Sequence, residues 1–388
     1  MNSQQYDIAI IGLGAMGSAA LYQLSKQGLS VVGIDKYAPP HTFGSSFGES
    51  RVTRQAIGEG EAYNPLVRRA NEIWGELEQV SSEKLLEHCG VLLAAHKEQR
   101  FLQNTLKAAK DFSIRHEILT GEEVERRFPA IKAAGKDRVY YFEPDSGYLL
   151  PEKCIEIQLK LARKNGAAIL PNTTVTSVSE RENGVELRLQ NGEIITASKV
   201  IIASGPWIKE MLPDTFGPIL KTYLQTQYWF AVEAEHAQDL QPPNMPVFMC
   251  GDEKSETTRS FYNFPLLNGA AGGMKFAAHE SGSEVKPDDK DTARPVTSMQ
   301  DIYRFLANYV QHIKPETVRA ANCLYTVTPD EDFIIDFAPG STRIVLVSAC
   351  SGHGFKHSAA IGEVLAQLVT RGTSDIDISG FGIERFSK

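Results

Sequence analysis

Three glycines near the start of the sequence lie between two apolar runs, and this pattern constrains the fold more than any other feature. The apolar run 8–11 leads into Gly12, Gly14 and Gly17, which have G-x-G-x-x-G spacing. A helical pattern follows, and a second apolar run ends at Asp35. A strand, a tight turn, a helix and a second strand in this order form the unit that binds a dinucleotide. We therefore predict such a unit here.

Each part of this unit has its own role toward a nucleotide. Gly12 forms the turn, Gly14 lets the pyrophosphate approach the backbone, and Gly17 lets the helix pack closely on the sheet. The helix N-terminus offers free N–H groups and a partial positive charge to the phosphates. Asp35 is placed to accept hydrogen bonds from a ribose diol. The glycine spacing alone is a weak signal, but in this context it indicates a site for FAD or NAD.

Length and charge limit the class of protein. A chain of 388 residues exceeds one ordinary core, so we expect two domains. The net charge of −8 argues against nucleic-acid binding. The sequence contains no apolar stretch of about 18 residues, so we expect no membrane-spanning segment.

The cysteines indicate a reducing compartment. They are scattered without a C-x-x-C pair, which suggests neither a metal site nor a disulfide framework. The N-terminus lacks the basic segment of a signal peptide, and its apolar run enters the nucleotide motif. We therefore expect a cytoplasmic protein without a bound metal. The cysteines are Cys89, Cys154, Cys250, Cys323 and Cys350.

Two later segments have the pattern of strands that return to the nucleotide-binding sheet. KVIIASG (199–205) and RIVLVSAC (343–350) are short buried runs. This interleaving favours FAD over NAD, because the longer FAD molecule must be held at both ends. Residues 217–328 contain alternating apolar and polar runs, which are typical of an antiparallel sheet.

These patterns predict an α/β fold, in the broad sense that includes α+β. It has a Rossmann-type FAD-binding domain and a substrate domain built on a mixed, largely antiparallel sheet. The predicted FAD-binding domain is discontinuous and comprises residues 1–85, 150–216 and 329–388. The predicted substrate domain comprises residues 86–149 and 217–328.

Local signals predict the elements around the motifs. Helical periodicity indicates helices over residues 64–78, 151–164 and 357–370, the last of them closed by Gly372. The polar, glycine-rich segment 39–54 is expected to be a loop across the cofactor.

In its longer motifs the chain resembles the family of monomeric sarcosine oxidase and N-methyltryptophan oxidase, which are FAD-dependent amine oxidases. The resemblance covers nearly the whole sequence. It rests on the motifs IIGLGAMG, PPHTFGSSFGESRVTRQAIGEGEAY, FEPDSGYL, NCLYTVTPDEDFIID and SGHGFKHSAAIGE. It implies FAD held covalently through a cysteine. It also implies oxidation of a secondary amino acid such as sarcosine, with O₂ as electron acceptor and H₂O₂ as product, by a monomer.

The resemblance assigns the flavin linkage to Cys323. A thiolate is a suitable partner for the 8α-methyl carbon of an oxidised flavin. An arbitrary buried cysteine is more often structural, and here the surrounding motif favours the linkage. Cys350 is the nearest competitor, and its position suits a buried residue at the end of a strand.

The resemblance also implies how the substrate is held. Arg51 matches a residue that packs against the flavin, and we count it among the expected catalytic residues. Arg54 and Lys356 match the two residues that bind the substrate carboxylate. Two cations that converge on one anion explain why an amino acid, rather than a simple amine, is the substrate. The alternative is that these are ordinary surface cations.

Further expected catalytic residues follow from the same motifs. Lys275 matches the oxygen-activating lysine, whose positive charge stabilises the anion formed when O₂ accepts an electron. At strand period Lys275 and His279 share one face, which we expect to face the flavin. His279 and Tyr262 match residues near the substrate amine; the alternatives are a buried imidazole and a core aromatic. Glu59 and His353 are expected to support the site.

We expect the cofactor to contact residues in every part of the predicted FAD-binding domain and the linking cysteine. These residues are Gly12, Gly14, Gly17, Asp35, Ser45, Arg51, Val175, Gly205, Cys323, Gly352, His353, Gly354 and Lys356.

Departures from the family pattern surround the flavin and the substrate. Ser46-Phe47 replaces a His-His pair, Ile57 replaces an aromatic residue, and His357 stands where an apolar aromatic is common. These changes put in doubt the amine that is accepted, not the reaction class. Because Phe47 and Ile57 add apolar bulk, we expect sarcosine to be a poor substrate and a larger amino acid to be a better one.

The sequence therefore predicts an FAD-dependent oxidase of an N-methyl (secondary) amino acid. The imine product hydrolyses to an aldehyde and the free amino acid. The alternatives are an oxidase of fructosyl or cyclic amino acids, a flavin amine dehydrogenase, an NAD-linked dehydrogenase, a non-catalytic flavoprotein and an RNA-modifying domain. The late motifs and Cys323 disfavour NAD, the retained site residues disfavour a non-catalytic protein, and the acidic charge disfavours RNA.

Overall fold

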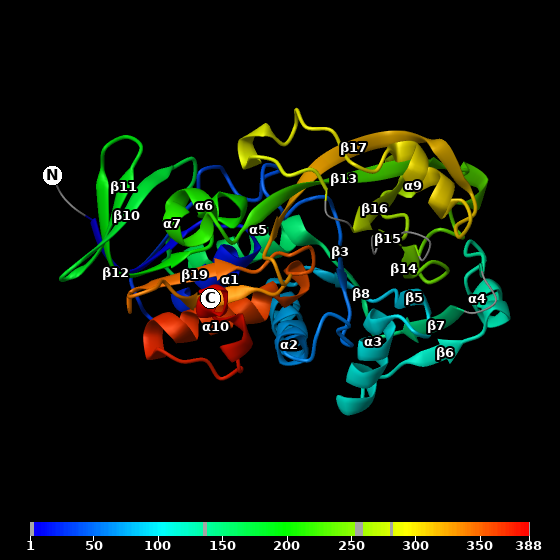
Figure 1. The fold of residues 1–388 in the computed structure, drawn as a ribbon, viewed down its shortest axis with the longest axis horizontal. Coiled ribbons are helices and arrows are strands. Elements are labelled where there is room, and N and C mark those ends of the chain that lie inside the picture. Colours follow the sequence, from blue (N-terminus) through cyan, green and yellow to red (C-terminus); the bar gives the residue numbers. More distant parts are fainter. Residues whose placement is uncertain (1–3, 135–137, 253–258, 280–281, 388) are drawn as a thin grey trace.

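The molecule is built on two large β-sheets with helices packed around them (Figure 1). Both sheets combine strands that lie far apart in the sequence. The computed structural model describes residues 4–134, 138–252, 259–279 and 282–387.

The N-terminal unit has the predicted form. Strand β1 (Gln4–Ile11), helix α1 (Ala15–Ser25) and strand β2 (Val31–Ile34) follow one another, and β1 pairs in parallel with β2. Gly12 has a φ of 89°, a left-handed conformation that glycine tolerates, and it turns the chain from β1 into α1. A Cβ atom on Gly17 would lie 1.7 Å from the Gly12 carbonyl oxygen. The close packing expected of Gly17 is therefore confirmed.

The first sheet draws on three separate stretches of the chain. Its later strands are β9 (Ala168–Leu170), β10 (Val175–Arg181), β11 (Gly184–Leu189), β12 (Ile194–Ile202), β18 (Ile334–Phe337) and β19 (Ile344–Ser348). The parallel part has the order β19-β12-β1-β2-β9, so both predicted late returns lie in the nucleotide-binding sheet. The β10–β11 hairpin extends this sheet beside β12 and lies at one end of the molecule (Figure 1).

The second sheet is mixed and largely antiparallel, as predicted. In spatial order its strands are β17 (Ile313–Val327), β13 (Lys221–Val232), β16 (Met274–His279), β15 (Arg259–Asn263), β14 (Val247–Asp252), β5 (Val91–His96), β7 (Arg138–Glu143) and β6 (Glu117–Leu119). Neighbours are antiparallel except β14 and β5. The length of β17 was not predicted, because its first ten residues are mostly exposed, and pairing with β13 imposes their extended form.

A small third sheet corrects one prediction. It contains β3 (Arg51–Thr53), β8 (Gly147–Leu149) and β4 (Leu86–Glu87). The segment 39–54, predicted to be entirely a loop, therefore ends in a strand, and Arg51 lies opposite Leu149. The prediction was wrong there because the partner strand lies about a hundred residues further along the chain. This pairing fixes the position of the Arg51 backbone.

The predicted helices are present. Helix α2 spans Tyr63–Ser81, α5 spans Pro151–Lys164, and α10 spans Ser358–Arg371 with Gly372 as its left-handed C-cap. In the described part of the chain, no helix is long and apolar enough to cross a membrane. The remaining helices are α3 (Arg100–Asp111), α4 (Gly121–Arg127), α6 (Ile208–Met211), α7 (Pro213–Phe216), α8 (Gly269–Gly272) and α9 (Met299–Leu306).

Each large sheet has its own apolar core. One core lies between the first sheet and helices α1, α2, α5 and α10, and α1 packs directly on α10 and α5. A second core covers the second sheet with residues of α4 and α9. The two expected domains and their boundaries stay a prediction.

Two helical glycines test the packing at the dinucleotide turn. Gly17→Ala should lower the free energy of unfolding by about 1–3 kcal/mol, because its Cβ has no space against the Gly12 carbonyl. Gly75→Ala in α2 is the matched control, since its Cβ would meet nothing within 4 Å. It should raise stability by about 0.5–1 kcal/mol. Urea unfolding followed by circular dichroism measures both, and equal effects would contradict the packing argument.

Candidate active site

A cavity of about 1520 Å³ is lined by residues of both large sheets. Gly12, Gly14 and Gly205 line it just after β1 and β12 of the first sheet, and Val175 lines it at the start of β10. Asp35 also lines it, with one carboxylate oxygen 2.7 Å from the Leu13 N–H and the other 2.8 Å from the Tyr37 N–H. Asp35 thus braces the turn, and it retains lone pairs for a ribose diol. Gly17 is not part of the lining and acts through packing alone.

Several buried polar atoms of the lining fit a large polar cofactor such as FAD. The hydroxyl oxygens of Ser45, Ser204 and Ser351 and the Nδ1 atom of His353 are buried and have no hydrogen-bond partner among the described residues. Buried polar groups are rarely left unpaired in a complete site. These atoms lie in the same cavity as the glycine turn, so the lining matches the donors and acceptors that FAD requires.

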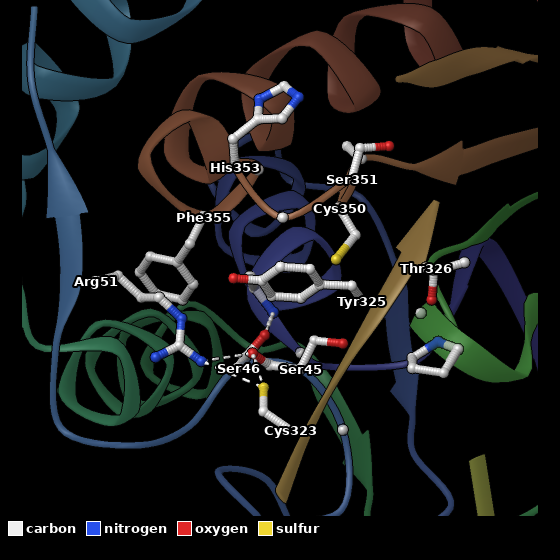
Figure 2. Close-up of a pocket in the computed structure, with 18 of the residues that line it drawn as sticks. Ser45, Ser46, Arg51, Cys323, Tyr325, Thr326, Cys350, Ser351, His353 and Phe355 are labelled. Carbon is white, nitrogen blue, oxygen red and sulfur yellow. Dashed lines mark hydrogen bonds between the residues drawn. The ribbon is translucent and has the colours of Figure 1, made fainter. Parts of the chain in front are cut away.

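Cys323 lies on β17 and faces the Arg51 guanidinium (Figure 2). The Cys323 Sγ atom is 3.7 Å from Arg51 Nη2 and 3.5 Å from the Ser45 carbonyl oxygen. Arg51 also donates a hydrogen bond of 2.8 Å to that carbonyl. Cys350 lines the cavity too, but burial raises the pKa of its thiol. The two cysteines therefore differ in their surroundings, because the Arg51 guanidinium lies directly beside the Cys323 thiol.

Lys275 lies behind the cavity wall, which corrects the expectation that Lys275 and His279 both face the cofactor space. Its Nζ atom donates hydrogen bonds to the Gly48 carbonyl (2.7 Å), the Ser50 carbonyl (2.8 Å) and the Ser50 hydroxyl (3.2 Å). Burial and the neighbouring Arg51 lower the pKa of Lys275. Three acceptors nevertheless match the three N–H bonds of an ammonium, so the structure accommodates the charged form. Lys275 reaches the cavity through Ser50, which does line it.

Two tyrosines and a histidine form another part of the lining. Tyr262 and His279 line the cavity as expected. The Tyr262 hydroxyl lies 3.4 Å from the Tyr325 hydroxyl. Burial raises the pKa of both phenols and lowers the pKa of His279, so all three groups are neutral near pH 7. Tyr325 was missed in the sequence, although its position two residues after Cys323 on one strand puts both side chains on the same face.

Arg54 and Lys356 are brought together by a third charged residue, Glu59. Arg54 Nη2 pairs with one Glu59 carboxylate oxygen, and Lys356 Nζ lies 3.1 Å from the other. All three residues line the cavity. Burial raises the pKa of Glu59, but Arg54 and Lys356 outweigh it and hold that pKa well below its usual range. The cluster therefore carries one net positive charge.

Burial also acts on Lys356 itself. It lowers the pKa of Lys356 to about 8, with Glu59 opposing the shift. The Arg54 guanidinium lies 4.8 Å from the centre of the Phe101 ring, and its Nη1 atom lies 3.9 Å from Met249 Sδ. Phe101 and Met249 line the cavity beside this cluster and were not found in the sequence, because only the tertiary contact with Arg54 reveals them.

The turn after β19 supplies the remaining expected cofactor residues. Gly352, His353 and Gly354 all line the cavity. The His353 ring stacks on Phe333 with a centroid distance of 4.7 Å. Burial lowers the pKa of His353 to about 3, so its imidazole is neutral. The His353 carbonyl accepts a hydrogen bond of 2.8 Å from Lys356, which links this turn to the charged cluster.

Phe47 and Ile57 are buried outside the cavity lining. Phe47 packs under the Lys290 ammonium, which lies 5.4 Å from the ring centre. Ile57 belongs to the core of the first sheet. The expectation that these two side chains select a larger substrate is therefore wrong in its premise. Met249 and Phe101 occupy the position beside Arg54 instead.

The chain is similar to known proteins over nearly its whole length. The chain is 36% identical to the monomeric sarcosine oxidase of Bacillus sp. (strain B-0618) over 388 residues, which cover 99% of this chain and 97% of that protein. It is 34% identical to the N-methyl-L-tryptophan oxidase of Yersinia pestis (strain Pestoides F), covering 98% and 99% of the two chains.

Solved structures share the fold at lower sequence identity. NikD, described as an unusual amino acid oxidase essential for nikkomycin biosynthesis, superposes with a TM-score of 0.84 at 21% identity, over 98% of each chain. The L-proline dehydrogenase of P. horikoshii superposes with a TM-score of 0.78 at 19% identity, over 99% of this chain and 98% of that one. Residues 7–368 match the family described as FAD dependent oxidoreductase, and the chain belongs to that family.

Proposed function

We propose that this protein is an FAD-dependent oxidase of N-methyl (secondary) amino acids, with O₂ as electron acceptor and H₂O₂ as product. The observation that carries the proposal is one cavity that joins the dinucleotide turn, Cys323 and the buried Arg54–Glu59–Lys356 cluster. The relatives named for sarcosine and N-methyl-L-tryptophan support it. When bound, FAD accepts a hydride equivalent from the substrate carbon and passes the electrons to O₂.

The charged cluster binds the substrate carboxylate in this proposal. Two cations and one carboxylate leave a net charge of one, so a monocarboxylate neutralises the cluster. A substrate amide would leave a desolvated cation unpaired, which costs about 2–5 kcal/mol. Glu59 holds Arg54 and Lys356 in place while no substrate is present.

The neutral side chains receive the amine. The amine reacts in its neutral form, because a protonated amine has no lone pair with which to form the imine. His279 offers a neutral imidazole and Tyr262 a phenol hydroxyl in the same cavity. These groups orient the amine through hydrogen bonds without adding charge.

The cofactor contacts belong to the same proposal. The glycine turn and the N-terminus of α1 hold the pyrophosphate, and Asp35 holds the ribose. Cys323 forms the covalent link, with Arg51 beside it. The buried Lys275 ammonium supplies a fixed positive charge through the Ser50 wall when O₂ is reduced. We further propose a cytoplasmic monomer, supported by five free cysteines and by relatives whose name includes the word monomeric.

A substrate panel with a peroxide readout tests the function. Sarcosine, N-methyl-leucine, N-methyltryptophan, proline, pipecolate and a fructosyl amino acid are offered to the flavin-loaded protein in air. We expect turnover of an N-methyl amino acid with one H₂O₂ formed per O₂ consumed. Reduction of the flavin without O₂ uptake would indicate a dehydrogenase. A clear preference for proline, pipecolate or the fructosyl compound would replace the N-methyl substrate by one of the alternatives.

The covalent link is tested by acid precipitation. The precipitated wild-type protein should stay yellow, because a thioether survives denaturation. Cys323→Ser should release its FAD into the supernatant. Cys350→Ser is the matched control, since Cys350 lines the same cavity, and it should retain the flavin. Release of all flavin from the wild-type protein would exclude the link.

The role of Lys275 is tested by following the two half-reactions separately in a stopped-flow instrument. Lys275→Met should slow flavin reoxidation by O₂ by about 10²–10³-fold. Anaerobic reduction by substrate should change far less, because the charge acts on an anion that forms only with O₂. Lys290→Met removes another buried ammonium that lies outside the lining, and it should change neither rate. Equal losses in both half-reactions would make Lys275 a structural residue.

The pH dependence of carboxylate binding tests the cluster. Propionate, which has no amine to titrate, should inhibit competitively. Lys356 is charged below its pKa of about 8 and neutral above it, so the inhibition constant should rise above pH 8, by up to about tenfold per pH unit. Lys356→Arg keeps its charge throughout this range and should remove the rise. A rise of the same size in both proteins would assign the titration to another group.

A further inference from the structure

Two histidines and a glutamate come together at an edge of the second sheet that does not line the cavity. Glu233 directly follows β13, and His312 directly precedes β17. These ends are held together because Val232 pairs with Ile313 and the Glu233 N–H donates a hydrogen bond of 2.9 Å to the His312 carbonyl. His236 follows three residues after Glu233 in a short 3-10 helix.

The side chains of this group lie close together. One ligand atom from each of Glu233, His236 and His312 lies within 4.8 Å of the other two. The two imidazole rings are stacked, with centroids 3.6 Å apart and planes inclined by 14°. His312 Nδ1 lies 2.8 Å from a Glu233 carboxylate oxygen, and this hydrogen bond lowers the pKa of that carboxyl. The group therefore presents an ionised carboxylate and two imidazoles.

We propose that Glu233, His236 and His312 bind a divalent transition metal ion, for which Zn²⁺ is the natural candidate. Imidazole and carboxylate ligands suit zinc, and zinc sites commonly combine two ligands close in sequence with a distant third. Tetrahedral bonds of about 2.0–2.2 Å require ligand atoms about 3.4 Å apart. An imidazole nitrogen binds a metal in the plane of its ring, so the three groups must approach and the two stacked rings must rotate out of their parallel arrangement. Their side chains are 41%, 41% and 22% exposed and can make this movement.

A fourth side chain orients the site. His236 Nδ1 lies 3.3 Å from a carboxylate oxygen of Asp239. A carboxylate on one ring nitrogen fixes the tautomer that leaves the other nitrogen free for a metal. A hydrogen-bonded pair requires only His312 and Glu233. His236 adds a second imidazole nitrogen that can serve as a metal ligand.

The metal would act on structure and not on the reaction. It would clamp the ends of β13 and β17, which are the longest paired strands described. Cys323 lies ten residues beyond Ile313 on β17, or about 33 Å at strand spacing. Because the ion would bind only the folded protein, the unfolding temperature should rise with the logarithm of the ion concentration once that concentration exceeds the Kd. Turnover should stay unchanged.

Calorimetric titration with ZnCl₂ tests the site in the full-length, flavin-loaded and untagged protein after treatment with EDTA and desalting. The wild-type protein should bind one equivalent of Zn²⁺. The unfolding temperature should rise with Zn²⁺, while kcat stays the same. Wild-type protein that binds no zinc would overturn the proposal and identify the group as a hydrogen-bonded surface cluster.

Variants assign the bound ion to these residues. His312→Asn removes a ligand and keeps a side chain that tolerates the left-handed backbone of this position, where φ is 64°. In this variant and in His236→Gln, the binding of one equivalent of Zn²⁺ and the rise in unfolding temperature should both be lost. Asp239→Asn should weaken binding by about tenfold. His88→Gln, which removes an exposed histidine outside the group, should bind like the wild type. A full equivalent retained in His312→Asn and His236→Gln would place the metal elsewhere and overturn the assignment.

Discussion

The buried carboxylate of Glu59 between Arg54 and Lys356 is the interaction on which the candidate site depends. A buried charge is tolerated only when it is paired, and here three charges from two distant segments satisfy one another. The pair with Arg54 holds the chain after β3, and the pair with Lys356 holds the turn after β19. The same interaction therefore closes the wall of the cavity and leaves one positive charge in it.

The rest of the cavity keeps its charges in separate places. Arg51 lies beside Cys323, Lys275 lies behind the Ser50 wall, and His279 is neutral because it is buried. Neutral aromatic and imidazole groups between fixed cations suit an anionic group at one point and an uncharged amine beside it. This distribution supports an amino acid better than a simple amine as substrate.

The sequence predicted the local parts of the fold well. The dinucleotide turn, α5 and the late strands of the first sheet follow from glycine spacing and apolar runs, which act over a few residues. The first half of β17 and the strand β3 could not be predicted, because pairing with strands far away in the chain imposes them. The role expected for Phe47 and Ile57 was wrong for a related reason. The position of a residue in a motif does not show whether its side chain points into a cavity or into a core.

The glycine turn by itself indicated a site for FAD or NAD, because a local pattern of glycines and apolar runs carries that property. The longer motifs, through their resemblance to a family, singled out Cys323, Arg54 and Lys356. Only the tertiary structure decided that Glu59 joins Arg54 to Lys356, that Lys275 lies behind the wall, and that Tyr325 meets Tyr262. It also brought His312 to Glu233 and His236. Strand pairing and burial bring these residues together from different parts of the chain, and no local sequence pattern encodes such contacts.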